Sequence, residues 1–161
     1  MTAVVEPLLA GMTACGEPED FHAAQPVSEP EVRALLGAAR VAPSADNLQT
    51  WRFIVVREER AREDLSRAVP EAMAASVAQA PLVLVACGVK AIIKGVRSEQ
   101  PFVMVDVPIA VVHLLLEARE LGLGCAWTLD FDEGRVRERL AIPAAVRVIA
   151  LLALGRLPGT E

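Results

Sequence analysis

The run Ala42-Pro-Ser-Ala-Asp-Asn-Leu-Gln-Thr-Trp51 decides the fold of this 161-residue sequence. It forms a polar connection between an amphipathic helical pattern and the apolar segment 52–57, which has the length and composition of a buried strand. Ser44, Asn47 and Gln49 supply a hydroxyl and two amides, which both donate and accept hydrogen bonds. Such groups suit the edge of a flat polar heterocycle. The same residue types are also typical of a capped helix end followed by a turn.

Periodicity on either side of this loop predicts the other elements. Ser28-Glu29-Pro30-Glu31 has the form of a capping box, so a helix is expected from there until Pro43 ends it. Asp106 and Asp132 are expected to cap two later helices, and Gly122 is expected to close the first of these. We expect a helix at 58–69, a second short helix that ends at about residue 80, and helices at 106–121 and 133–140. Strands are expected at 52–57, 81–87, 125–129 and 147–154.

The predicted strands are rich in Val, Ile and Leu without alternation, which indicates that both of their faces are covered. Buried strands between helices predict an α/β or α+β sandwich. The length suits a single domain over residues 1–161.

Composition excludes several classes of protein. The sequence is 53% hydrophobic with a net charge of −5, which excludes wholesale disorder and argues against a nucleic-acid partner. Asp106, Pro108 and His113 interrupt the longest apolar stretch, so we predict no membrane span. No basic leader precedes the first apolar run, so no secretory signal is expected.

The three cysteines, Cys15, Cys87 and Cys125, are odd in number and form no CxxC pair. We therefore expect neither a disulfide framework nor a metal site, and the cytoplasm is the simplest location. The predicted helix 106–121 is apolar nearly all round, which is typical of a core or a subunit interface. His113 within it is expected to be a buried interface histidine.

Four motifs resemble the FMN-dependent nitroreductase family and occur in the family's order. They are AAR-x-APSADNLQTWRFIVV (38–56), D-x-x-IA-x-x-x-LLLEARELGLGCAW (106–127), FDEGRVRERLAIP (131–143) and ALLALGR (150–156). The resemblance covers about residues 26–156. It implies an α+β fold, an α/β/α sandwich with a central, mostly antiparallel sheet. It also implies an intertwined homodimer with two flavins bound across the subunit interface.

The resemblance assigns roles to individual positions. Ser44, Asn47 and Gln49 would contact the FMN, Pro43 and Ala45 would shape the loop, and the backbone near Leu129 and Asp130 would approach flavin N5. NAD(P)H would reduce the flavin, and a small organic acceptor such as a nitroaromatic or a quinone would then be reduced. The chemistry belongs to the flavin, so no catalytic side chain is predicted.

The sequence departs from the family where the phosphate of FMN is expected. The family usually has an arginine-rich run there, whereas residues 15–20 carry Glu17, Glu19 and Asp20, which would repel a phosphate. Arg156 is the only cation after the last predicted strand. Thr50 replaces the proline that the family usually has before the residue equivalent to Trp51. The cations Lys90, Lys94 and Arg97 either reach the phosphate or form an exposed basic face.

Two functions from different classes follow. The first is an FMN-dependent NAD(P)H oxidoreductase that acts on a small-molecule substrate. The second is a divergent relative that has lost FMN binding and serves as a ligand-binding protein or a non-catalytic partner subunit. Arg135, Arg137 and Arg139 are interpreted as the solvated side of a short helix.

Overall fold

The computed structural model describes residues 20–89 and 101–157. The possible helix in 2–14, the acidic residues Glu17 and Glu19, and the cations Lys90, Lys94 and Arg97 lie outside these ranges. The elements are α2 (Glu29–Arg40), η1 (Ala45–Asn47), β1 (Trp51–Val56), α3 (Glu59–Ser66), α4 (Glu71–Gln79), β2 (Leu82–Val89), α5 (Val103–Glu120), β3 (Gly124–Thr128), α6 (Glu133–Leu140) and β4 (Val146–Gly155).

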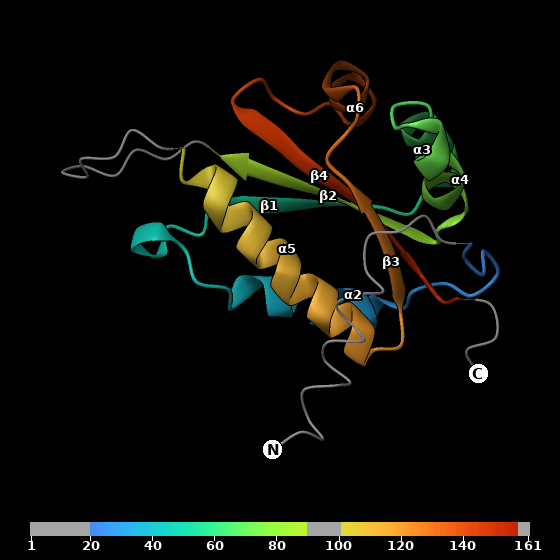
Figure 1. Ribbon diagram of the computed structural model, residues 1–161, viewed down its shortest axis with the longest axis horizontal. Helices are drawn as coiled ribbons and strands as arrows, with labels where there is room; N and C mark the ends of the chain where they lie inside the picture. Colours follow the sequence, from blue (N-terminus) through green and yellow to red (C-terminus); the bar gives the residue numbers. More distant parts are fainter. Residues whose placement is uncertain (1–19, 90–100, 158–161) are drawn as a thin grey trace.

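The strands form one sheet with the order β1-β2-β4-β3, in which all neighbouring strands are antiparallel. Helices α2 and α5 cover one face of this sheet, and α3, α4 and α6 cover the other (Figure 1). The predicted α+β class, with helical layers on both sides of an antiparallel sheet, is therefore confirmed.

Burial on both faces explains why the central strands β2 and β4 lack alternation, whereas the edge strand β1 leaves Arg52 and Val55 exposed. In β2, Leu82 and Leu84 pack into the core beneath α2 and α5, while Val83 and Val85 pack into the core beneath α3, α4 and α6. All four side chains have an exposed fraction of 0%. Residues on both faces of a central strand therefore need to be apolar, because neither face contacts water.

Several local predictions of helix ends are confirmed. Ser28 and Glu31 form the expected capping box at the start of α2. The side chain of Asp132 accepts a hydrogen bond from the Arg135 amide at 3.1 Å and caps α6. Gly122 follows α5 with a φ of 69°, the left-handed conformation that glycine adopts at low cost.

The prediction that Asp106 caps α5 is wrong. The helix begins one turn earlier, at Val103, and its cap residue is Phe102, which makes no side-chain capping bond. Asp106 lies inside the first turn and bonds to another segment, as described below. Although α5 is long and apolar, no helix within the described ranges combines the length and apolar character needed to cross a membrane.

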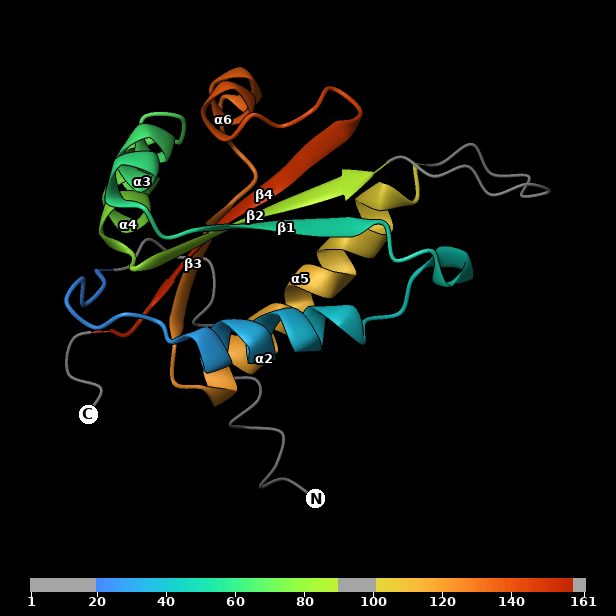
Figure 2. The same ribbon diagram turned by 180° about the vertical axis from the view of Figure 1, so that it is seen from behind.

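Three segments meet at one end of the sheet. Trp51 at the start of β1 pairs with Gly88 near the end of β2, and the Val89 amide donates to the Thr50 carbonyl at 2.9 Å. The start of α5 lies against the same place: a Cβ added to Gly88 would lie 1.7 Å from Val103 Cγ2. Figure 2 shows the starts of β1 and α5 and the end of β2 together, beside η1.

Candidate functional site

The loop between α2 and β1 has an unusual backbone. A 3-10 turn spans Ala45–Asn47, and Asp46, Asn47 and Gln49 all have a positive φ, of 52°, 53° and 48° respectively. The left-handed region is costly for residues with a Cβ, although Asn and Asp tolerate it better than most. A loop with several such residues persists only where its surroundings fix it.

Two side-chain oxygens accept hydrogen bonds from amides of this loop. Ser44 Oγ accepts from the Gln49 amide at 3.0 Å, which closes the loop on itself. Asp106 Oδ1 accepts from the Ala45 amide at 3.0 Å, which ties the loop to α5 across 61 residues of sequence. Asp106 was missed as a site residue. The available signal was its position as a lone carboxylate in the apolar run 102–116.

Buried polar atoms without partners lie at the edges of this loop. Thr50 and Asp106 have exposed fractions of 5% and 2%. Within residues 20–89 and 101–157, Thr50 Oγ1 and Asp106 Oδ2 have no hydrogen-bond partner. Buried polar atoms are normally satisfied. Arg62 Nε and Arg156 Nη1, elsewhere in the described residues, also lack a partner, so this feature is not confined to the loop.

The side chains that the loop presents fit the edge of a flavin ring. Asn47 is exposed and Gln49 is half-buried, and Gln49 Nε2 donates to Asn47 Oδ1 at 3.3 Å. Each amide retains further donors and acceptors, and both are neutral. The polar edge of an isoalloxazine carries both donors and acceptors, so this donor set matches it.

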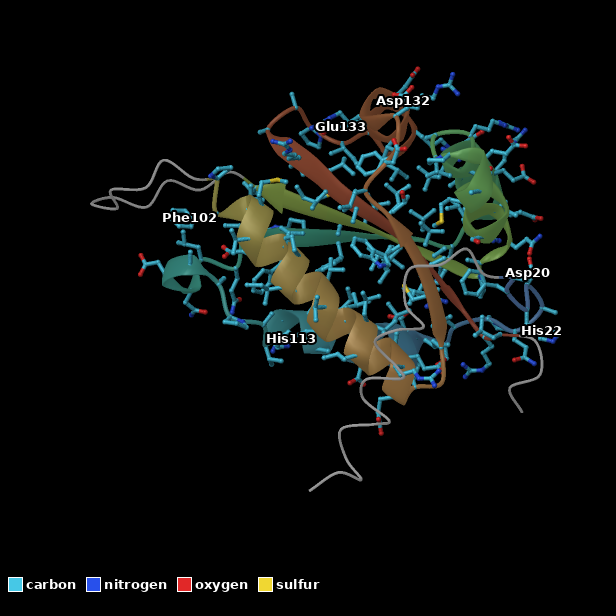
Figure 3. All side chains as sticks on the ribbon, viewed as in Figure 1. Asp20, His22, Phe102, His113, Asp132 and Glu133 are labelled. Atoms are coloured by element: carbon cyan, nitrogen blue, oxygen red, sulfur yellow. The ribbon has the colours of Figure 1, made fainter. Side chains whose placement is uncertain are left out.

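An apolar surface on α5 continues from the same end of the sheet. Val105, Val112 and Leu116 are 48%, 46% and 36% exposed and recur on one side of the helix. Met104 adds to this surface at the start of α5, where it is 42% exposed. His113 lies on α5 beside these residues and is half-buried (Figure 3).

The second predicted contact segment, Leu129 and Asp130, is not brought to the loop within one chain. It follows β3, which is the opposite edge of the sheet from β1. Three strand spacings separate the two edges, about 14 Å in total. The Asp130 amide donates to Thr128 Oγ1 at 3.0 Å, whereas Leu129 is 62% exposed.

The predicted cation after the last strand is already paired. Arg156 Nη2 lies 2.6 Å from Glu31 Oε1. Asp20 lies at the surface beside Phe21, whose ring packs near Gly155 at the same end of β4. Arg156, the cation that follows the last strand, is therefore already neutralised by Glu31.

A separate hollow of about 380 Å³ lies between α3 and α6 and is lined by Asp64, Arg67, Arg135, Glu138 and Arg139. Its arginines are engaged in ion pairs: Arg67 and Arg139 with Asp64 at 2.8 and 2.7 Å, and Arg135 with Asp132 at 3.3 Å. Asp132 and Glu133 mark the start of α6 in Figure 3. The interpretation of Arg135, Arg137 and Arg139 as a solvated helix face holds for Arg135, which is 63% exposed. It is wrong for Arg137 and Arg139, which are 25% and 33% exposed and pair with Glu133 and Asp64.

The chain is similar to one known protein family over residues 21–156. A model of the nitroreductase family matches residues 21–86 and 75–156. A protein of Archaeoglobus fulgidus named as an NADH dehydrogenase/NAD(P)H nitroreductase is 32% identical, with 80% of this chain and 74% of that protein covered.

Solved structures give the same result for the fold. A nitroreductase family protein from Clostridium novyi NT has a TM-score of 0.85 and 25% identity, covering 96% of this chain and 88% of that chain. An FMN-dependent nitroreductase from Clostridium difficile R20291 has a TM-score of 0.78 and 22% identity, covering 95% and 89% of the two chains. The second likeness concerns the fold alone.

Proposed function

Because the chain belongs to the nitroreductase family, an oxidoreductase family, we propose that it is an FMN-dependent enzyme. It passes electrons from NAD(P)H to a small organic acceptor such as a nitroaromatic or a quinone, and it acts in the cytoplasm. The observation that carries this proposal is the 43–49 loop, whose left-handed backbone presents neutral amides beside an apolar helix face. When bound, FMN would supply the chemistry by accepting a hydride and passing on electrons.

The residues of the chain act by binding and orienting the flavin. Asn47 and Gln49 would hold the polar edge of the ring, and Ser44 keeps Gln49 in place by accepting from its amide. Pro43 and Ala45 shape the entry to the loop. The left-handed backbone would hold these amides in position before the ligand arrives, which would lower the entropic cost of binding.

We propose that the working form is a homodimer. The exposed apolar residues Val105, Val112 and Leu116 would be covered by a second copy, since such a stripe is typical of an interface. The 129–130 segment lies at the opposite sheet edge from the 43–49 loop. A second copy would therefore bring its own Leu129 and Asp130 to this loop and complete the site.

A second candidate function has specific support in the charges. Glu17, Glu19 and Asp20 stand where the family resemblance implies cations, and Arg156 is paired with Glu31. A chain with this pattern would bind the phosphate of FMN weakly and would act as a ligand-binding or non-catalytic partner protein. Replacing Glu17 and Glu19 with arginine should raise FMN affinity if repulsion is the cause, and unchanged affinity would count against that cause.

The proposed function is tested on purified protein incubated with excess FMN and freed of unbound ligand. We expect a flavin absorption band to remain with the protein, and we expect oxidation of NADH or NADPH that depends on added quinone or nitroaromatic. A colourless protein with no such oxidation would reject the enzyme and leave the second candidate.

A further inference from the structure

Asp106 has contacts that its own helix does not explain. Its carboxylate is 2% exposed, in the first turn of α5. A carboxylate near a helix N-terminus is stabilised by the helix dipole, which favours its presence there. The cap position, however, belongs to Phe102, and Asp106 Oδ1 instead accepts from the Ala45 amide at 3.0 Å. The hydrogen bond is therefore directed at the loop.

The position of Asp106 is fixed by the packing of the start of α5 on β2. Val103 lies one turn before it and packs so closely on Gly88 that a Cβ there would lie 1.7 Å from Val103 Cγ2. The start of α5 therefore cannot slide along β2 without losing this contact. Asp106 presents its oxygen to the loop from a rigid support, which is what a positioning group requires.

The loop needs such a support because its backbone is strained. Asp46, Asn47 and Gln49 are all left-handed, and this conformation persists only when neighbouring groups hold it. Ser44 stabilises this backbone from within the loop, by accepting a hydrogen bond from the Gln49 amide. Asp106 stabilises it from a different element, by accepting a hydrogen bond from the Ala45 amide at the start of the 3-10 turn.

We infer that Asp106 is a positioning residue for the site of the proposed function, on which this inference rests. By accepting from the Ala45 amide, it holds the loop in the left-handed form that directs Asn47 and Gln49. It also couples the loop to α5, the helix that carries the exposed apolar face. Asp106 itself touches no reacting atom in this scheme.

The bond can be removed from either end. Asp106→Ala deletes the acceptor. Ala45→Pro deletes the donor at a residue that lies outside both core clusters. Ser44 has the extended backbone, with φ −141° and ψ 157°, that a following proline requires. Asp106→Asn keeps an acceptor oxygen in place. Val136→Ala is the matched control, since Val136 is buried at 0% exposure in the core on the opposite face of the sheet.

Two readouts are measured on each full-length variant: FMN affinity from quenching of flavin fluorescence, and hydrogen exchange of peptides covering residues 44–50 without flavin. We expect Asp106→Ala and Ala45→Pro each to weaken FMN binding by about tenfold or more and to speed exchange in the loop. The double variant should be no worse than either single one, because both changes remove the same bond. Asp106→Asn should stay within about threefold of the wild type.

Val136→Ala should lower thermal stability and leave both readouts unchanged. Wild-type FMN affinity in Asp106→Ala or Ala45→Pro would overturn the inference, as would additive losses in the double variant or an equal loss in Val136→Ala. If the wild-type protein binds no FMN, the proposed function fails. Hydrogen exchange in the 44–50 peptides then tests the role of Asp106 by itself. Faster exchange in Ala45→Pro would support the inference that the bond to Asp106 fixes the loop, and unchanged exchange would refute it.

Discussion

Arg156 at the end of β4 is tied to Glu31 in the first turn of α2, with 2.6 Å between Nη2 and Oε1. The two side chains are 30% and 17% exposed, so solvent screens this pair less than an ordinary surface pair. Glu31 also accepts from the Ser28 amide through Oε2 at 2.7 Å. One carboxylate thus caps a helix and fixes the last strand, which gives it a structural role.

The stability contributed by Glu31 should depend on pH. Burial raises its pKa, but hydrogen bonds from Ser28 and Arg156 outweigh burial and hold the pKa below its ordinary value. A carboxyl whose folded pKa is lowered stabilises the fold above its unfolded pKa, about 4.3, and loses that contribution as the pH falls through the folded pKa. We expect Glu31→Gln to lower the free energy of unfolding by about 1 kcal/mol at neutral pH.

The check is urea denaturation of wild type and Glu31→Gln over a series of pH values. The difference between them should shrink as the pH falls below the ordinary glutamate range. Glu29→Gln is the control, because the Glu29 side chain is 62% exposed and its ion pairs contribute little. A difference between wild type and Glu31→Gln that stays constant down to acid pH would contradict this prediction.

Gly88 should tolerate no side chain. A methyl group there would overlap Val103 Cγ2, so Gly88→Ala has to displace the start of α5 or the end of β2. We expect a loss of about 1–3 kcal/mol in the free energy of unfolding. Gly37→Ala is the opposite case, because Gly37 lies within α2 with no atom within 4 Å of an added Cβ. It should gain about 0.5–1 kcal/mol. Thermal denaturation of the wild type and both variants measures these changes. A Gly88→Ala variant as stable as the wild type would refute the close packing of Val103 on Gly88.

Local signals predicted most of the fold, and long-range contacts explain what they missed. The Ser28–Glu31 box and the Asp132 cap follow from residues three apart, so sequence spacing reveals them. Asp106 looked like another cap, since the sequence does not show that its partner is Ala45, 61 residues away. Arg156 looked like a free cation for the same reason, because its partner lies 125 residues away.

The candidate site is predictable in part only. The side chains of Ser44, Asn47 and Gln49 indicate a polar loop, and the resemblance adds a ligand. The left-handed backbone of Asp46, Asn47 and Gln49 is not visible in their residue types, since none of them is glycine. The separation of this loop from Leu129 depends on strand order, which strand composition does not determine.

The Cys87 thiol should be inert in the folded protein. Burial raises its pKa to about 11, although the Arg137 guanidinium opposes this effect. At neutral pH only about one thiol in ten thousand is then ionised, and the thiolate is the reactive form. We expect iodoacetamide to modify Cys87 only after denaturation, as mapped by mass spectrometry of quenched samples. Rapid alkylation of Cys87 in the native protein would contradict its burial.

The proposed dimer predicts a change in oligomeric state. Val112→Asp combined with Leu116→Asp places charges on the exposed apolar face of α5, where a second copy would have to bury them. We expect light scattering after size exclusion to give a dimer for the wild type and a monomer for this variant. Arg33→Asp is the control, since Arg33 is a 77% exposed side chain on α2. A monomeric wild type would refute the proposed assembly.

The most direct test of the flavin site is a crystal structure of the full-length protein grown with excess FMN. We expect the following arrangement: an isoalloxazine lies against the 43–49 loop of one copy, with its polar edge at Asn47 and Gln49 and with Leu129 or Asp130 of a second copy across the ring. A structure without flavin at this loop, with protein atoms filling the space or with each copy isolated, would contradict it.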